Sequence, residues 1–416
     1  MAFQCIAGLI IFVAVSWAVS ENPRAVKLKT VFTGLFIQFL LAVLLLKLPF
    51  FRQIFIVLNS AVLGLVEACK AGTSMVFGYL GGGTLPFSES FPGASYILAF
   101  QALPLLILMS AISSLLFYWK ILPALVKSFS WVLKKTFGLG GAEGVGVSAN
   151  IFVGMVESPL FIRPYFPDLT RSELFSLMTT GMATIAGTVM VLYATLLKDT
   201  IPDVLGHILV ASIISAPAAI TVAKTMIPET RPVTSGDATP PETATSSMDA
   251  VTQGTMQGVE LFINIVAMLV VLVALVYIVD LLLGLLPHFQ GESFTLKRLL
   301  GWIMSPVAWL MGIPWHEAHT AGSLMGTKTI LNEFLAYMDL GNLPKDALGQ
   351  NSRLILTYAM CGFANPGSLG IMIGGMGTMA PDRRSEIASL GLRAVLAGTI
   401  ATCMTGAVVG LITAVG

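Results

Sequence analysis

The stretch NIFVGMVESPLFIRPYF, Asn150–Phe166, is apolar almost throughout, yet it contains the acid Glu157 together with Gly154, Pro159 and Pro164. Glycine and proline interrupt a regular helix, because one lacks a side chain and the other lacks a backbone donor. A carboxylate in apolar surroundings is costly, so it is kept where it has a function or a partner. The stretch therefore predicts a polar site on a short, broken segment inside an apolar protein.

The composition predicts an integral membrane protein. Of 416 residues, 56% are hydrophobic and 11% are charged, whereas about a quarter of a soluble domain is charged. The mean hydropathy is +0.86, and a net charge of +1 gives no reason to expect nucleic acid as a partner. The four cysteines form no CxxC pair, so neither a zinc site nor a disulfide framework is indicated.

Eight apolar windows are long enough to cross a membrane as helices. They are Phe3–Val19, Thr30–Leu48, Ile97–Tyr118, Phe175–Leu197, Leu205–Thr225, Val259–Leu285, Leu354–Gly374 and Ile387–Val415. The first has no Lys or Arg before Arg24, so it is predicted to be a retained helix rather than a signal peptide. Lys and Arg gather in every second connection, and because basic loops stay in the cytoplasm, both termini are predicted to lie outside it.

Two further apolar stretches, Val145–Phe161 and Met311–Tyr337, would disturb the alternation of basic loops if either crossed the membrane. Each is predicted to be a re-entrant hairpin that enters and leaves by the same side, the first from inside and the second from outside. Irregular backbone at membrane depth is tolerated only where protein buries it or where it lines a wet cavity. The two hairpins are therefore expected to build the site.

Each hairpin carries an acid and precedes an interrupted helix. Glu157 is followed by Thr180–Tyr193, which has small residues at its centre. Glu333 is followed by Cys361–Gly375, in which the triplet NPG at 365–367 is expected to break the helix. Paired interrupted segments of this kind mark the central site of transporters with inverted repeats. A single acid would also suit a structural role at a hairpin tip, but two in matching places favour a functional pair.

The predicted fold class is an all-α integral membrane protein with eight transmembrane helices, two re-entrant hairpins in an inverted repeat, and interfacial helices. Three segments that mix apolar and cationic residues are predicted to lie in the interface: Arg52–Lys70, Ile121–Phe137 and Lys297–Leu310. The Pro-, Ser- and Thr-rich segment Pro228–Ala250 is predicted to be a flexible cytoplasmic linker. The predicted sections are 1–137 (scaffold and interfacial helices), 138–227 (first hairpin, helices 4 and 5), 228–255 (linker), 256–310 (helix 6 and an interfacial helix) and 311–416 (second hairpin, helices 7 and 8).

Catalytic and metal chemistry find little support in the sequence. WHEAHT resembles the zinc motif HExxH, but His316 and His319 are three residues apart instead of four, and no third ligand is evident. No GxxxxGK[ST] motif is present to bind ATP phosphates. The protein is predicted not to be an enzyme and to need no cofactor. An intramembrane enzyme using Glu157 and Glu333 as an acid–base pair, and a channel, are the competing interpretations.

Several long motifs, in order, resemble the concentrative nucleoside transporter family. NIFVGMVESPLFIRPY resembles the family pattern N-x-F-V-G-Q-T-E-[AS]-P-L-x-[VI]-R-P, and SELFSLMTTGMATIAGTV, PETRP, LNEFLAY and CGFAN-x-x-S match family motifs as well. The resemblance implies a homotrimer in membrane lipid. In each protomer a scaffold of outer helices would surround a moving transport domain made of both hairpins and the broken helices.

The resemblance also implies the binding residues. The ribose would be held by residues of the second hairpin and the helix after it, namely Glu333, Phe363, Asn365 and Ser368. The nucleobase would be held by the first-hairpin tip and the fourth helix, at Met155, Val156, Glu157 and Val189. A coupling sodium ion would be bound by Asn150, Val153, Thr184 and Ile185, through side-chain oxygens and backbone carbonyls.

The chain departs from the family pattern at Met155 and Val156, where most relatives have Gln-Thr. Losing an amide and a hydroxyl from the base-facing surface predicts a relaxed or shifted base preference. The predicted function is sodium-driven symport that imports nucleosides across a bacterial inner membrane, by elevator-like alternating access. Proton coupling, or transport of another hydroxylated solute, are the alternatives.

Overall fold

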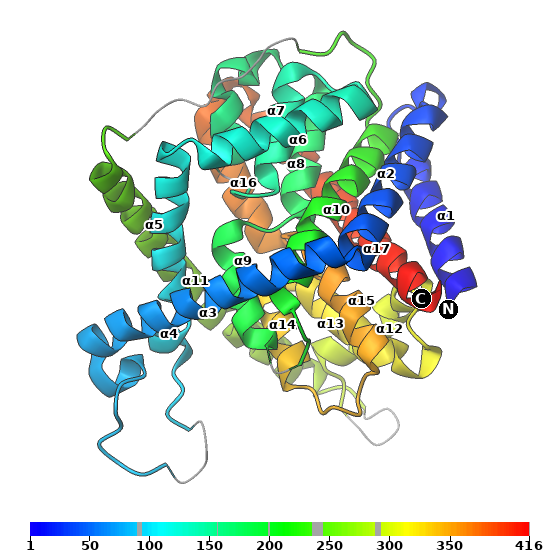
Figure 1. Cartoon of the computed structure of the whole chain (residues 1–416). Helices are drawn as coiled ribbons and strands as arrows, with labels where there is room; N and C mark the ends of the chain where they lie inside the picture. The colour runs from blue at the N-terminus through cyan, green and yellow to red at the C-terminus, as the bar shows by residue number, and fades with distance from the viewer. Residues whose placement is uncertain (90–93, 156, 199, 235–243, 288–292, 416) are drawn as a thin grey trace.

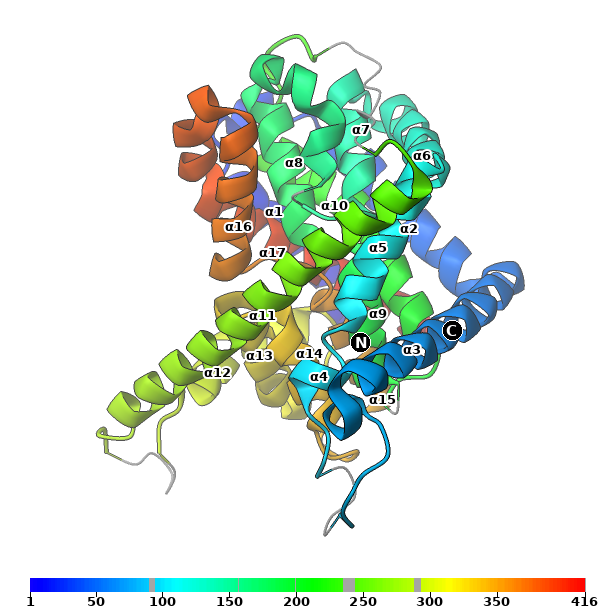
Figure 2. The ribbon, with the colours of Figure 1, turned by 90° about the vertical axis from the view of Figure 1, so that its left-hand side faces the viewer.

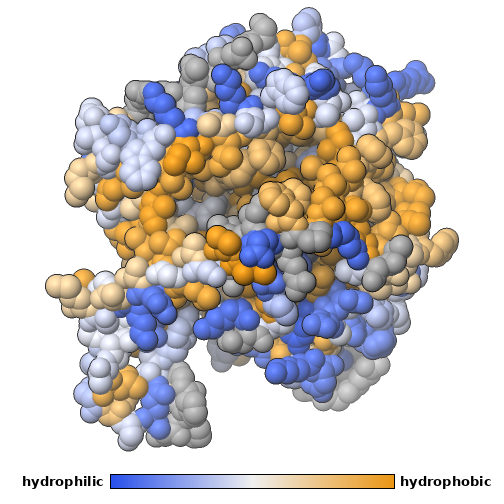
Figure 3. All heavy atoms as spheres, in the orientation of Figure 1, coloured by the Kyte–Doolittle hydropathy of each residue, from blue (hydrophilic) through white to orange (hydrophobic). Residues whose placement is uncertain are grey.

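The computed structural model describes the chain except for residues 90–93, 156, 199, 235–243, 288–292 and 416. Among the described residues every regular element is a helix. Hydrophobic side chains gather in a band across the middle of the molecule, between two more hydrophilic ends (Figure 3). Seven of the described helical segments are long and apolar enough to cross a membrane. The predicted class, an all-α membrane protein, is confirmed.

The α-helices, in chain order, are α1 (Ala2–Ala18), α2 (Leu28–Lys47), α3 (Pro49–Phe77), α4 (Leu98–Gln101), α5 (Leu105–Tyr118), α6 (Ile121–Phe137), α7 (Gly141–Asn150), α8 (Arg171–Ala183), α9 (Gly187–Leu197), α10 (Val204–Met226), α11 (Ser247–Leu283), α12 (Leu296–Leu310), α13 (Trp315–Ile330), α14 (Glu333–Asn342), α15 (Gln350–Ala359), α16 (Pro366–Met379) and α17 (Arg384–Val415). Short 3-10 helices are η1 (Pro23–Ala25), η2 (Gly78–Gly81), η3 (Ser158–Asp168) and η4 (Pro381–Arg383). Each of the eight predicted windows falls on one of these α-helices or on a consecutive pair.

Helix α3 is longer than the interfacial helix predicted at Arg52–Lys70. It runs for 29 residues and ends at Gly78, whose φ of 61° favours glycine. Lys70 does not end the helix, because a lysine on an exposed face can extend its ammonium toward water. The segment Ser60–Gly81 is apolar enough to cross a membrane by length and composition, although α3 crosses the upright helices at a steep angle (Figure 1).

The predicted linker, residues 228–255, overlaps helix α11 at its C-terminal end and is hydrogen-bonded to α8 near its N-terminal end. Helix α11 begins already at Ser247, because the Ser246 side chain caps it by accepting a hydrogen bond from the Asp249 backbone. At the other end, Thr234 donates from its backbone and its hydroxyl to Glu173 of α8. Residues 235–243 lie outside the described part of the chain.

The two hairpins lie at opposite ends of the molecule. The first hairpin (α7 and η3) lies with α8 at one end, and the second (α13 and α14) lies with α15 at the other, in both views (Figures 1 and 2). The long helices α10 and α17 run between these ends and are largely buried. The order hairpin, interrupted helix, long helix therefore occurs twice, in opposite directions.

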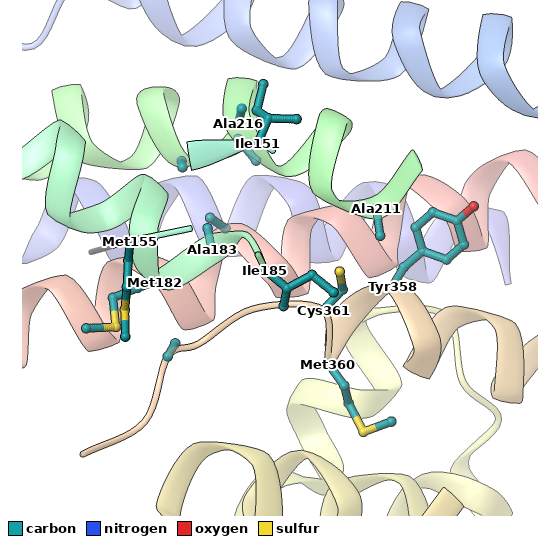
Figure 4. Close-up of a cluster of buried hydrophobic side chains, with 14 of the residues drawn as sticks. Ile151, Met155, Met182, Ala183, Ile185, Ala211, Ala216, Tyr358, Met360 and Cys361 are labelled. Atoms are coloured by element: carbon teal, nitrogen blue, oxygen red, sulfur yellow. The ribbon is translucent and has the colours of Figure 1, made fainter. Parts of the chain in front are cut away.

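The two interrupted helices meet near their breaks. A Cβ atom added to Gly362, in the break between α15 and α16, would lie 2.8 Å from the carbonyl oxygen of Met182 at the end of α8. Figure 4 shows Ile185 and Cys361, one from each break, in a single buried cluster with Met155 of the first-hairpin turn. The breaks are thus packed in the core between the two halves.

Candidate functional site

The turn of the first hairpin is held against the break between α8 and α9. Gly154 adopts a φ of 111°, which a residue with a side chain would strain to adopt. The carbonyl oxygen of Phe152 accepts a hydrogen bond from the backbone of Gly187, the first residue of α9 (2.9 Å). Gly154 and Glu157, which follow this bond along the chain, both line a cavity.

The turn of the second hairpin places its acid at the start of a helix. Asn332 caps α14, since its side-chain oxygen accepts a hydrogen bond from the Leu335 backbone (2.9 Å). Glu333 is therefore the first residue of α14, where the positive end of the helix dipole favours a carboxylate. Its side chain is nearly buried, with 5% of the residue exposed.

Glu333 is bonded to both halves of the molecule. One carboxylate oxygen accepts from the Tyr193 hydroxyl of α9 (2.7 Å), and the other accepts from Nδ2 of Asn365 (2.9 Å). Asn365 in turn caps α16 by accepting from the Ser368 backbone (2.8 Å). The prediction that Asn-Pro-Gly breaks the helix was wrong in detail: the break precedes it, and Pro366 is the first residue of α16, where a missing N–H costs nothing.

A cavity of about 200 Å³ lies between these elements. It is walled by both hairpin turns, the starts of α9 and α16, and one face of α11. Of the eight residues predicted to bind solute, Val156 lies outside the described residues. The other seven line the cavity: Met155, Glu157, Val189, Glu333, Phe363, Asn365 and Ser368. Their role as solute contacts stays a prediction.

Four polar residues in the cavity wall were not predicted: Tyr193, Thr188, Asn264 and Asn332. Asn332 had a detectable signal, because it directly precedes the acid in a capping position. Asn264 is an amide within the apolar helix α11, a pattern that marks functional residues in membrane helices. Tyr193 had no signal, since its partner Glu333 lies 140 residues away in sequence.

The predicted sodium ligands are buried together behind the first-hairpin turn. Thr184 donates to the carbonyl oxygen of Asn150 (3.2 Å), which ties the end of α7 to the break after α8. Val153 and Ile185 are also buried. The Asn150 side chain is fully buried, and neither its oxygen nor its nitrogen has a hydrogen-bond partner among the described residues. An unpaired buried amide costs about 1–3 kcal/mol, and a hard cation is a ligand that its oxygen would suit.

Three family models match successive parts of the chain. The Na+ dependent nucleoside transporter N-terminus matches residues 7–80, a Gate domain described as nucleoside recognition matches residues 99–200, and the Na+ dependent nucleoside transporter C-terminus matches residues 207–410. Together they cover both hairpins and both interrupted helices.

Individual relatives match over almost the whole chain. Nucleoside permease NupC of Helicobacter pylori is 33% identical over 412 residues, 98% of this chain and 96% of its own. Transporter YutK of Bacillus subtilis, itself uncharacterized, is 37% identical over 409 residues, 97% of this chain and 98% of its own. Human solute carrier family 28 member 3 is 34% identical over 424 residues, which are 97% of this chain and 59% of that protein.

Solved structures match the fold as closely. CNTnw in an inward-facing substrate-bound state superposes with a TM-score of 0.91 at 32% identity, covering 100% of this chain and 99% of that one. A CNTnw variant in an outward-facing state superposes with a TM-score of 0.92 at 32% identity, covering 100% and 98%. With family models, relatives and structures in agreement along its length, this chain belongs to the concentrative nucleoside transporter family.

Proposed function

We propose that the protein imports nucleosides across a bacterial inner membrane together with sodium ions. The observation that carries this proposal is the pairing of two features, one in the wall of the cavity and one behind that wall. A carboxylate, Glu333, is bonded by Tyr193 and Asn365 on one side. Behind the turn of the opposite hairpin lies the buried amide of Asn150, which has no hydrogen-bond partner within the described part of the chain. The first feature suits a hydroxylated solute and the second suits a hard cation.

The second half is proposed to bind the ribose. A ribose presents two adjacent hydroxyls, which a carboxylate can accept from while an amide both donates and accepts. Glu333 and Asn365 offer these groups, already bonded to each other, and the Ser368 hydroxyl lies in the same wall. Because Tyr193 and Asn365 already hold the carboxylate in place before the solute enters, little conformational entropy of this side chain is lost on binding.

The first half is proposed to bind the nucleobase with weak discrimination. Met155 and Val189 present apolar surface to the cavity, and Glu157 is the acid in the same wall. Apolar surface stacks on any base, whereas buried polar groups reject a base that cannot pair with them. Asn264 of α11 offers an amide in the cavity wall opposite the hairpins. Uptake of both purine and pyrimidine nucleosides is therefore proposed.

Sodium is the proposed coupling ion, and it would be held as a co-transported substrate by Asn150, Val153, Thr184 and Ile185. The oxygen-rich donor set and the burial of Asn150 support this proposal.

Alternating access is supported by the composition of the cavity wall. Hairpins and broken helices form most of it, and α11, which packs on α5 outside them, forms the remainder. Movement of the first group past α11 would turn the site from one side of the membrane to the other.

The homotrimer and the orientation of the chain, with both termini outside the cytoplasm, are part of the proposal. The apolar window of α11 has no buried residue within a single chain, so the face of this helix that is turned away from the cavity and from α5 meets either lipid or a neighbouring copy. Native mass spectrometry of protein in detergent would test the trimer. A monomer at every detergent concentration would contradict it.

The decisive experiment is uptake of labelled uridine and labelled adenosine into proteoliposomes, with an inward sodium gradient or with choline in place of sodium. We expect sodium-dependent uptake of both, and loss of uptake in a Glu333→Gln variant, with Glu260→Gln on the exposed face of α11 as control. Uptake that follows a proton gradient and ignores sodium would overturn the coupling ion. Uptake inhibited by free sugars and by neither nucleoside would overturn the substrate class.

A further inference from the structure

Helix α6 turns a face that is both cationic and apolar to the outside of the molecule. On the opposite face, four residues are buried against neighbouring elements: Leu122, Val126, Ser130 and Leu133. The exposed face carries Lys127, Trp131 and Lys135 at the four-residue spacing that aligns side chains along a helix. Trp131 is 63% exposed, and the Lys135 ammonium lies 5.1 Å from the centre of its ring. Such a face is typical of a helix that lies in the interface between membrane and water.

The connection between α1 and α2 adds a second cationic stretch beside the end of α6. It contains three exposed cations: Arg24, Lys27 and Lys29. Lys27 and Phe137, the last residue of α6, line the same hollow of about 130 Å³. Phe137 also packs on α2, because a Cβ added to Gly34 would lie 3.2 Å from its ring. The fold thus brings together two cationic stretches that are far apart in sequence.

Few carboxylates oppose these cations. Residues 22–66 and 90–142, which include both stretches, contain no Asp or Glu. Glu21 is paired with arginines of α8 and α17, and Glu229, which lines the hollow, is paired with a lysine of α10 (3.6 Å). Among the described residues, no ion pair is formed by the five exposed cations that we call the cationic patch: Arg24, Lys27, Lys29, Lys127 and Lys135. This excess of positive charge favours an anionic partner.

The buried face of α6 leads to the first hairpin. A Cβ added to Gly144 of α7 would lie 3.1 Å from Oγ of Ser130. The Phe129 ring packs edge-on against the ring of Phe152 in the hairpin turn, with 5.2 Å between the ring centres. The Phe152 carbonyl oxygen in turn accepts the hydrogen bond from Gly187 of α9. The position of α6 in the membrane therefore bears on the turn that lines the cavity.

We propose that the cationic patch binds the headgroups of anionic phospholipids, and that the bound lipid restricts the motion of the first hairpin. Helix α6 lies crosswise to the upright α1 and α5 (Figure 1), in a hydrophilic end of the molecule directly beside the hydrophobic band (Figure 3). Its lysines are thus level with lipid phosphates, and the Trp131 indole lies among the headgroups. A zwitterionic headgroup carries its own cation, so it meets the patch with no net charge. Lipid binding is independent of the transported solute and of the coupling ion.

The test is native mass spectrometry of the detergent-solubilised protein, titrated with phosphatidylglycerol or with phosphatidylcholine of the same acyl chains. The variant Lys127→Gln/Lys135→Gln removes two charges from α6. Its control, Lys47→Gln/Lys345→Gln, removes two exposed charges at the far end of α2 and after α14. All four side chains are exposed, so both variants are expected to fold.

We expect the wild type and the control variant to bind phosphatidylglycerol more tightly than phosphatidylcholine. Each lysine near an anionic headgroup strengthens binding about fivefold, so the α6 variant should bind phosphatidylglycerol about 25-fold more weakly. Three results would overturn lipid binding by the patch: no preference between the two lipids, an equal loss in both variants, or displacement of the lipid by excess inorganic phosphate. If the α6 variant did not fold, Lys127→Gln and Lys135→Gln would be measured singly, each with about fivefold weaker binding.

The effect on the hairpin is measured by hydrogen exchange over residues 141–155 in nanodiscs of either lipid. We expect slower exchange in phosphatidylglycerol for the wild type and the control variant, and no difference between lipids for Lys127→Gln/Lys135→Gln. Equal exchange of the wild type in both lipids would show that bound lipid does not restrict the hairpin.

Discussion

Glu333 depends on a donor from another element, and that dependence is measurable. Replacing Tyr193 by Phe removes the hydroxyl that donates to the carboxylate and leaves the ring in its contact with Tyr337. Hydrogen bonds to charged groups contribute about 1.5–3 kcal/mol. We therefore expect the KM for uridine uptake to rise roughly tenfold or more. Tyr277→Phe, on the exposed face of α11, is the control; an unchanged KM in Tyr193→Phe would show that the hydroxyl does not position the carboxylate.

Asn150 carries the sodium prediction at the scale of one side chain. Asn150→Ala removes an amide that is buried without a partner among the described residues, so the free protein should lose little stability or gain some. We expect the sodium concentration for half-maximal uptake to rise at least about tenfold, because a ligand oxygen is lost. Asn342→Ala, at the exposed end of α14, should leave it unchanged. A large loss of melting temperature without a change in sodium dependence would indicate a structural role instead.

At the scale of elements, the close approach of the two breaks requires a glycine. A Cβ on Gly362 would lie 2.8 Å from the Met182 carbonyl oxygen and 2.8 Å from Cγ2 of Thr402, closer than normal contacts allow. Overpacking of this kind costs about 1–3 kcal/mol. We expect Gly362→Ala to lower the melting temperature and the uptake rate together. Gly374→Ala on α16, where a Cβ would meet nothing within 4 Å, should raise or preserve the melting temperature.

At the scale of the whole molecule, charges join the α1–α2 connection to two distant helices. Glu21 is paired with Arg171 of α8 and with Arg393 of α17, and Arg171 also reaches Glu386. The hydrogen bond from Arg171 lowers the pKa of Glu21. Because the folded-state pKa is below the unfolded one, this stabilisation is present above the unfolded pKa and is lost as the pH falls through the folded pKa.

We therefore expect Glu21→Gln to melt at a lower temperature than the wild type at pH 7, by a small margin. These side chains are partly exposed, and such ion pairs contribute about 0–1 kcal/mol. The margin should begin to fall as the pH drops below the ordinary glutamate pKa of about 4.3, should vanish below the lowered folded-state pKa, and should shrink in high salt. Melting curves from pH 7 to pH 3 measure it, with Glu67→Gln on α3 as control. A margin that persists at low pH would mean that Glu21 acts through packing and not through its charge.

The sequence predicted some elements better than others, for local reasons. Ile121–Phe137 has the bounds of α6, because its cationic stripe repeats at helical spacing and Gly138 follows it. The start of α11 was predicted too late, because the Pro-, Ser- and Thr-rich composition typical of a linker continues up to Ser246, the residue that caps this helix. The break before α16 was placed too late, because a proline that cannot continue one helix is well suited to start the next.

By itself the sequence determined the membrane class, the helical elements and the position of an acid in each hairpin turn. Hydropathy acts over long windows, and glycine, proline and capping residues act on their neighbours, so these features are readable along the chain. Only the tertiary structure decided that Tyr193 meets Glu333, that Asn264 lines the cavity and that Lys328 is buried against Thr402. Those contacts arise where helices far apart in sequence pack together. The local spacing of residues does not predict which side chains come into contact there.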